Sequence, residues 1–148
     1  MCFVTPNNEI IFQHRAKDKD TFPDLLDATV GGHVEIGDSY EEAAIKETLE
    51  ETGVAIDASD LIPIVKFHQN FKDEVMGKIN HAFQQEYVYF FNGSINDLKI
   101  EIGKSLGFEA WSIEKLSNLS DAEKLKFIPY IYKFTSTTLV DFVYNKLK

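Results

Sequence analysis

The chain has 148 residues, of which 44% are hydrophobic and 13% aromatic, so it can bury one sizeable core. Its formal net charge of −9 lacks the basic footprint that long nucleic acids require, whereas nucleotide-sized ligands remain compatible because a metal ion can mediate phosphate contacts. The single cysteine excludes an intramolecular disulfide and a cysteine-built zinc cluster, and no run approaches the roughly 20 apolar residues of a membrane span.

These features predict a single domain over residues 1–148. With no signal peptide and no membrane segment visible, we expect a cytoplasmic protein that does not bind membranes. Because the chain opens almost inside an apolar run, we also allow for a segment upstream of Met1.

The first part of the chain predicts a β-hairpin followed by a polar loop. Residues 2–4 and 9–13 are apolar runs, and the turn-forming sequence between them fits a tight connection. The loop, residues 14–27, carries Arg15, the only arginine of the chain. Arg15 is either an ordinary surface cation or a substrate-binding residue that holds a phosphate or carboxylate.

The segment from Gly31 to Val54 contains the strongest helix signals. Ser39 with Glu42 three residues later forms a capping box, and the body, residues 40–52, has no proline or glycine. Gly53 stands where a left-handed residue ends a helix. The i, i+4 pairs in this helix predict an inward apolar side, formed by Ala44, Ile45, Thr48 and Leu49.

Three glutamates of this helix, Glu47, Glu50 and Glu51, share one side within an arc of roughly 100°. Like charges at this spacing repel, so the cluster is either a fully solvated face or one side of a cation site. Gly31 and Gly32 lie just upstream and let the backbone approach a ligand. Hard divalent cations prefer carboxylate, carbonyl and water oxygens, and usually also hold substrate phosphates.

The same segment resembles the Nudix box, in which a glycine, five residues, a glutamate and seven residues precede Arg-Glu-U-x-Glu-Glu-x-Gly-U, with U apolar. The spacing is kept throughout, and the matching residues are Gly32, Asp38, Lys46-Glu47, Glu50-Glu51, Gly53 and Val54. Asp38, Lys46 and Thr48 depart from the pattern. The change to Lys46 matters most, because an ammonium lacks the planar two-pronged grip of the guanidinium that orients the neighbouring glutamate in the family.

A second, partial resemblance lies upstream of the box. Thr21-Phe22-Pro23 followed by Gly31-Gly32-His33-Val34 resembles a Nudix subgroup related to isopentenyl diphosphate isomerase. That subgroup usually continues with Gly after the proline and then Leu-Trp-Asp, whereas this chain has Asp24 and Leu26 in the Gly and Trp positions. We expect His33 to be a loop residue, because a hard cation beside it favours oxygen ligands.

Beyond the box the sequence predicts strands and then helices. We expect strands at about 63–70, 81–91 and 108–113, a polar loop at 72–80, an ambiguous segment at 98–102 and a short helix at 113–119. A last helix, about 128–147, has a core-facing stripe, although the run Thr135 to Thr138 is poor helix-forming material. Composition supports only an α/β or α+β class, and the resemblance implies an α/β/α sandwich with a mixed sheet.

The resemblance also implies Mg²⁺-dependent hydrolysis of a diphosphate bond, in a nucleoside diphosphate linked to another moiety or in a similar small molecule, with Mn²⁺ as a substitute metal. Its implied metal ligands are Glu47, Glu50, Glu51 and a carbonyl of the glycine loop, from Gly32 or Gly31. Gly31 would also bind the substrate. The general base would be one of the box glutamates or a later one, such as Glu101 or Glu109. Lys46 would orient Glu47 or form a salt bridge to Glu50.

Two alternatives compete with a hydrolase. The isomerase uses a catalytic cysteine immediately before Gly-His, a place that Gly31 takes here, while Cys2 is far away in sequence. A non-catalytic nucleotide-binding module of the Nudix fold would typically lose box carboxylates, yet Glu47, Glu50 and Glu51 are all kept. Aromatic residues on the expected exposed strands are compatible with a homodimer, and loops outside the box decide the substrate.

Overall fold

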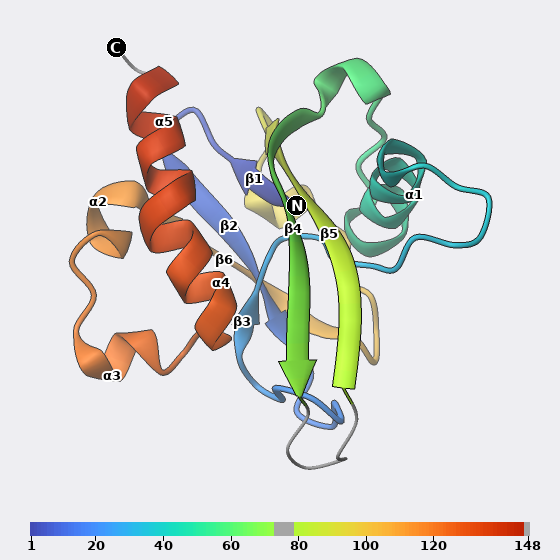
Figure 1. Ribbon diagram of the computed structural model, residues 1–148. Helices are drawn as coiled ribbons and strands as arrows, with labels where there is room; N and C mark the ends of the chain where they lie inside the picture. The colour runs from blue at the N-terminus through green and yellow to red at the C-terminus, as the bar shows by residue number, and fades with distance from the viewer. Residues whose placement is uncertain (73–78, 147–148) are drawn as a thin grey trace.

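The structure, a computed structural model, describes residues 1–72 and 79–146, so most of the loop expected at 72–80 lies outside the described residues. A mixed sheet forms the middle layer, with helix α1 (Tyr40–Thr52) on one face and the C-terminal helices on the other (Figure 1). The strands are β1 (Cys2–Val4), β2 (Glu9–Arg15), β3 (Leu26–Asp27), β4 (Ile62–Lys72), β5 (Ile79–Phe90) and β6 (Ser105–Ser112).

Strand pairing explains why the sheet is mixed. The order is β3-β2-β1-β5-β4, and β6 pairs with β2. β1 runs antiparallel to β2 but parallel to β5, whereas β4 and β5 form a long antiparallel pair. The predicted hairpin at the start is confirmed, with Phe3 opposite Ile11. The predicted polar loop 14–27 is wrong at both ends, because His14 and Arg15 belong to β2 and residues 26–27 form the short strand β3.

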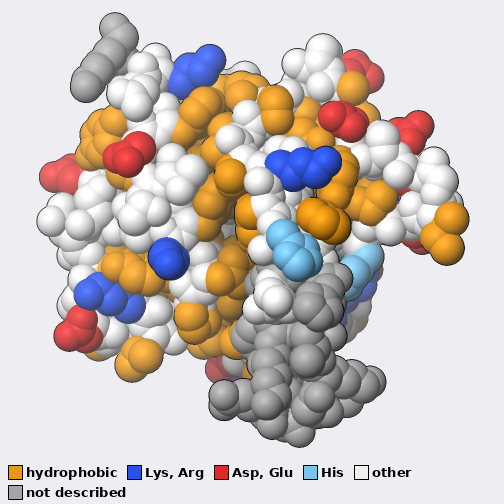
Figure 2. Space-filling model, viewed as in Figure 1, with side chains coloured by type: hydrophobic (Ala, Val, Ile, Leu, Met, Phe, Trp, Pro, Cys, Tyr) orange, Lys and Arg blue, Asp and Glu red, His pale blue; other side chains and the backbone are white. Residues whose placement is uncertain are grey.

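Alternating side chains of β1 and β2 build two cores, one on each face of the sheet, as the period of two in a strand requires. Cys2 and Phe12 pack on one face against the C-terminal helices, while Phe3 and Ile11 pack on the face that carries α1. All four side chains are fully buried. Figure 2 shows hydrophobic side chains gathering in the centre of the view, over the boundary between the C-terminal helices and the sheet. The α/β/α arrangement expected from the sequence is therefore present.

Short helices make up the remaining elements, most of them in the last third of the chain. These are the 3-10 turns η1 (Ala58–Asp60) and η2 (Ile95–Asp97), the helices α2 (Ile113–Leu116), α3 (Asp121–Lys124) and α4 (Pro129–Phe134), the π-helical turn η3 (Thr135–Leu139) and α5 (Val140–Lys146). No helix in the described part of the chain is both long and apolar enough to span a membrane.

The threonine run does not break the last helix but widens it. α4, η3 and α5 form one continuous rod (Figure 1). Inside it, the Thr135 and Thr137 hydroxyls each donate to the carbonyl four residues earlier, at 2.7 Å. Such hydroxyl bonds compete with the regular helix ladder, and a single π turn accommodates them. The predicted core stripe holds, because Ile131, Leu139 and Val143 are at most 1% exposed.

Helix α1 begins and ends where the sequence predicts. Ser39 accepts from the Glu42 N–H, the Glu42 carboxylate accepts from the Ser39 N–H, and Gly53 takes a left-handed φ of 74°. The predicted inward side is wrong in one member, since Leu49 is 52% exposed. Thr48 is buried as predicted, and Thr52 is buried as well; each hydroxyl donates to a carbonyl of its own helix at 2.6 Å and so needs no outside partner.

Candidate active site

A cleft of about 1020 Å³ opens beside α1, over the end of β2 and the middle of β5. Its walls come from parts of the chain that are far apart in sequence. They include Gln13 and Arg15 of β2, the loop from Gly31 to Glu35, Glu47 and Glu51 of α1, Gln84 to Tyr87 of β5, Lys104 and Tyr130. Two of the three box glutamates therefore face the cleft.

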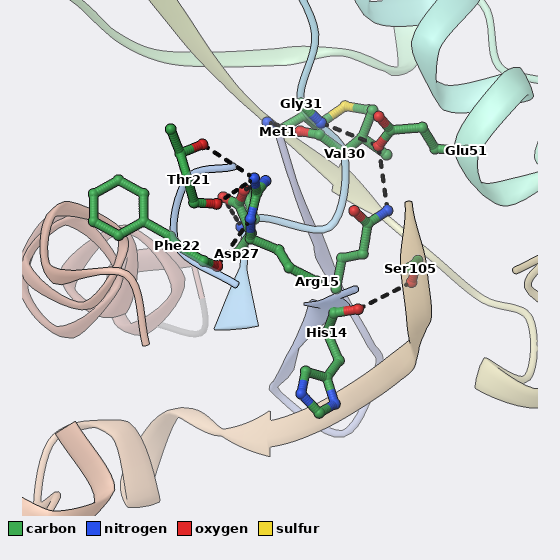
Figure 3. Close-up of polar contacts among 12 residues, drawn as sticks. Met1, His14, Arg15, Thr21, Phe22, Asp27, Val30, Gly31, Glu51 and Ser105 are labelled. Carbon is green, nitrogen blue, oxygen red and sulfur yellow. Dashed lines mark hydrogen bonds and ion pairs between the residues drawn. The ribbon is translucent and has the colours of Figure 1, made fainter. Parts of the chain in front are cut away.

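Glu51 is the buried carboxylate of this cleft, at 5% exposed. Its Oε2 accepts from the backbone N–H of Gly31 and from Nε2 of Gln13, both at 3.3 Å, and Figure 3 shows the side chain pointing at the glycine loop. Burial, with the nearby charge of Glu47 adding to it, raises the pKa of Glu51 to about 7. A carboxyl group that is costly to ionise in the free protein gains from a bound cation.

Glu47 lies directly over Gly32. A Cβ placed at Gly32 would come within 2.2 Å of Cδ of Glu47, so any larger residue here would push this carboxylate aside. Partial burial and the charge of Glu50 raise the pKa of Glu47, and Lys104 opposes that rise. The first glycine of the box thus has a steric reason in this chain.

Lys46 and Glu50, the other two predicted residues of this helix, point away. The Lys46 ammonium pairs with Glu35 Oε2 at 2.9 Å, and this hydrogen bond raises the pKa of Lys46. Neither predicted contact of Lys46, with Glu47 or with Glu50, is an ion pair of the described residues. Lys46 instead ties α1 to the loop that precedes it. Glu50 is exposed and lies outside the set of described residues that line the cleft.

Arg15 lines the cleft, but its donors hold the neighbouring loop. Its Nε donates to the Phe22 carbonyl at 3.1 Å, one terminal nitrogen donates to Asp27 Oδ2 at 3.1 Å, and the other donates to the Thr21 carbonyl at 2.8 Å (Figure 3). The guanidinium therefore fixes the loop of residues 21–27, of which Asp27 lines the cleft. A role in binding the substrate remains part of the proposal below.

A second loop brings further charges to α1. Glu101 Oε1 accepts from the Lys104 ammonium at 3.0 Å, and Glu101 Oε2 is buried with no hydrogen-bond partner among the described residues. The charge of Glu101 is the smallest of the causes that raise the pKa of Glu47, and Glu101 lies outside the set of described residues that line the cleft. Glu109, the other predicted base, lines a separate pocket of about 380 Å³ beside His14. Of these two glutamates, Glu101 is thus the one whose ion-pair partner, Lys104, lines the cleft.

Sequence reasoning missed two residues of the cleft, Gln13 and Lys104. Gln13 lies at the end of an apolar strand, and only the fold shows that its amide reaches Glu51. Lys104 follows a segment whose structure the sequence leaves ambiguous. Neither position has a local signal that could have identified it.

The donor atoms of the cleft fit a hard divalent cation. They are carboxylate oxygens of Glu47 and Glu51 together with backbone oxygens of the glycine loop, all of the type such ions prefer. Within the described residues, no three His, Cys, Asp or Glu side chains lie close enough together to hold a metal ion. A divalent ion in this cleft would therefore draw on backbone and water oxygens in addition to the Glu47 and Glu51 carboxylates.

Comparison with known proteins agrees with this geometry. The model of the NUDIX domain matches residues 1–135. An uncharacterized Nudix hydrolase of Clostridium acetobutylicum is 29% identical over 113 residues, 76% of this chain and 53% of the relative. The chain thus matches about half the length of that relative.

Solved structures share the fold. The NUDIX domain of Shewanella oneidensis NrtR, in complex with ADP ribose, superposes with a TM-score of 0.65 at 13% identity, over 99% of this chain and 84% of that one. A bifunctional NMN adenylyltransferase/ADP ribose pyrophosphatase from Francisella tularensis, in complex with AMP and an Mn ion, superposes with a TM-score of 0.60 at 16% identity, over 95% and 40%. Nudix hydrolases generally use divalent metals. By its matched domain and its box, this chain belongs to the NUDIX domain family.

Proposed function

We propose that the chain is a pyrophosphohydrolase that uses Mg²⁺, or Mn²⁺ in its place, to hydrolyse a diphosphate bond in a nucleoside diphosphate linked to another moiety or in a similar small molecule. The observation that carries the proposal is Glu51, a carboxylate buried in an open cleft beside Glu47 and against the N–H of Gly31. Two structural neighbours hold nucleotide-type ligands, ADP ribose in one and AMP with an Mn ion in the other, which supports this substrate class.

In this proposal the role of each carboxylate follows from how exposed it is. Glu47 and Glu51 would hold the metal ion with a carbonyl of Gly32, since these groups surround one end of the cleft. When bound, the ion would neutralise the phosphates and lower the pKa of a water molecule. Glu50 is exposed, and its charge helps to raise the pKa of Glu47. In this proposal it completes the ligand set or acts as the general base.

The proposed hydrolysis needs only water and the diphosphate substrate. The water oxygen attacks one phosphorus atom, the bridging P–O bond breaks, and the water proton passes to a glutamate, Glu50 or Glu101. Lys46 holds the glycine loop through Glu35, while Gly31 and Arg15 contribute to the wall that the substrate meets. Lys46 is then a positioning residue that acts through the loop.

Cys2 argues against an isomerase with a cysteine nucleophile. Its side chain is fully buried in the core on the face opposite α1, and burial raises the pKa of its thiol to about 12. A thiol with such a pKa is almost entirely protonated at neutral pH and is a poor nucleophile. The remaining alternative is a nucleotide-binding module without turnover, which would bind the same ligands and leave them intact.

A substrate panel tests the proposal. Nucleoside diphosphate derivatives, dinucleoside polyphosphates and prenyl diphosphates are incubated with the full chain and Mg²⁺ or Mn²⁺, and cleavage products are separated by chromatography. We expect metal-dependent cleavage of at least one class, abolished by a chelator. Binding without cleavage of any class would support the non-catalytic module instead.

The wider setting belongs to the same proposal: one domain, in the cytoplasm, acting on a small-molecule diphosphate and, where it self-associates, forming a homodimer. Light scattering of the purified chain gives its oligomeric state. Fractionation of cells that produce it gives its compartment.

A further inference from the structure

We propose that Lys104 is the built-in counter-cation of the cleft: it holds the Glu101 carboxylate toward Glu47 and Glu51 before a metal ion binds, and a metal ion displaces it. This inference rests on the proposed function, because it concerns the same metal site. It adds a positioning residue that lies outside the Nudix box, on the loop of residues 99–104.

The loop is fixed at both of its ends. The N–H of Lys99 donates to the Thr52 carbonyl at the end of α1, at 2.8 Å, and the N–H of Ala16 donates to the Lys104 carbonyl at 3.0 Å. Gly103 has a φ of +86°, which lets the chain turn sharply between them. The backbone therefore holds Lys104 beside the acidic end of the cleft, whatever its side chain does.

The side chain itself faces the carboxylates. Its ammonium lies 3.0 Å from Glu101 Oε1, and Lys104 lines the cleft together with Glu47 and Glu51. Its charge partly offsets the rise in pKa of Glu47 and of Glu51, as expected for a nearby cation. Lys46 does not share this place, because its ammonium is paired with Glu35 on the exposed loop.

The arrangement suits a cation that can leave. The Lys104 side chain keeps 46% of its surface exposed, and lysine carries its ammonium on a flexible stem. The second oxygen of Glu101 has no hydrogen-bond partner among the described residues, so this carboxylate can accept a further cation. When a divalent ion enters, repulsion from it favours movement of the ammonium toward the substrate phosphates, which are anionic.

If Lys104 and Glu101 formed only an ordinary surface ion pair, removing the Lys104 charge would leave metal affinity unchanged. Metal affinity therefore distinguishes a surface ion pair from a counter-cation. Mn²⁺ is titrated into the full chain without substrate, and free Mn²⁺ is followed by its electron paramagnetic resonance signal at low ionic strength. The variants are Lys104→Met, Lys104→Arg and the matched control Lys99→Met, which removes an exposed lysine from the same loop.

We expect Lys104→Met to bind Mn²⁺ more tightly, by about threefold to tenfold, because a competing positive charge is gone. Lys104→Arg should keep the weaker binding of the unaltered protein, and Lys99→Met should match that protein. With substrate present, Lys104→Met should lower kcat and also lower the metal concentration needed for half-maximal rate. A merely structural role would lower kcat without tightening metal binding.

Three results would overturn the inference. Unchanged or weaker Mn²⁺ binding by Lys104→Met would remove the counter-cation role while leaving the proposed hydrolase intact. An equal shift in Lys99→Met would show a general effect of net charge. Failure of the unaltered protein to bind Mn²⁺ at all would defeat both this inference and the proposed function. If thermal melting shows that Lys104→Met is unfolded, Lys104→Gln removes the same charge and decides the question.

Discussion

The two helical layers that cover the sheet are built for different purposes. The C-terminal rod buries aliphatic side chains, with Ile131, Leu139 and Val143 at most 1% exposed. Helix α1 instead buries Thr48, Glu51 and Thr52, and leaves Leu49 more than half exposed. Buried aliphatic groups stabilise a fold, whereas a buried carboxyl group costs stability unless it is paired. One layer therefore stabilises the domain, and the other holds a site.

The largest expected effect is that of Glu51→Gln. The change removes a metal-binding carboxylate but keeps the size and the hydrogen-bonding ability of the side chain, so turnover should fall at least about 100-fold. The melting temperature should stay the same or rise, because the carboxyl group is costly to bury as an ion. Steady-state kinetics and calorimetry check the two halves, and a near-normal rate would take Glu51 out of the metal site.

Leu139→Ala should lower stability and leave turnover nearly unchanged, the reverse of Glu51→Gln. Leu139 is fully buried in the core beneath the rod, and its truncation should lower the free energy of unfolding by about 2–5 kcal/mol. Because Leu139 does not line the cleft, kcat of the folded variant should change by less than about twofold. Denaturant unfolding measures the first effect. Leu49→Ala is the matched control, since Leu49 is exposed and its loss should cost little.

The metal-free protein should lose stability as the pH rises. The pKa of Glu51 is about 7 in the fold and near 4.5 ordinarily, so between these values the folded state binds more protons than the unfolded state. Its burial is thus tolerated below about pH 4.5 and costs about 3 kcal/mol above pH 7. Urea unfolding across this window measures the slope. In Glu51→Gln the free energy of unfolding should depend less on pH. An unchanged pH dependence in that variant would assign the effect to other groups.

Gly32→Ala tests the contact between the glycine loop and α1. The new Cβ would meet the Glu47 carboxyl group, so Glu47 must swing aside and kcat/KM should fall about 10–100-fold. Stability should fall only slightly, because the backbone of Gly32 does not take a left-handed φ. Gly31→Ala is the control, since nothing lies within 4 Å of a Cβ at that position. Equal losses in both variants would argue against the steric explanation.

Lys46→Met should have the smallest effect. Its ion pair with Glu35 is exposed, and such pairs contribute little to stability, about 0–1 kcal/mol. If Lys46 acts only by holding the loop, KM should rise about twofold to fivefold while kcat is nearly kept. A loss confined to kcat would show instead that Lys46 orients Glu47, as the resemblance to the box implies.

The sequence predicts best what local interactions determine. The start and end of α1 follow from Ser39, Glu42 and Gly53, whose capping contacts lie within one turn of the helix. The two-sided core follows from alternation along β1 and β2. The box spacing identifies the family and brings Glu47 and Glu51 to the cleft, because residues four apart share one helix face.

Contacts between distant segments could not be predicted in this way. The partner of Lys46 is Glu35, although the two glutamates predicted to pair with it, Glu47 and Glu50, are nearer in sequence. The guanidinium of Arg15 donates hydrogen bonds to residues 21–27, because the loop folds back over the end of β2. Lys104 reaches α1 only through the way its loop is fixed to Thr52 and Ala16. Each of these depends on tertiary packing, which carries no periodic signal in the sequence.

The central claim, that Glu51 is a metal-binding carboxylate held partly protonated until an ion arrives, has a direct test. Mg²⁺ is titrated into the full chain at pH 6 in two buffers with different enthalpies of ionisation, and the heats are compared. The account predicts that binding releases roughly one proton, so the heats differ between buffers, and that Glu51→Gln abolishes the difference. Binding with equal heats in both buffers would contradict it.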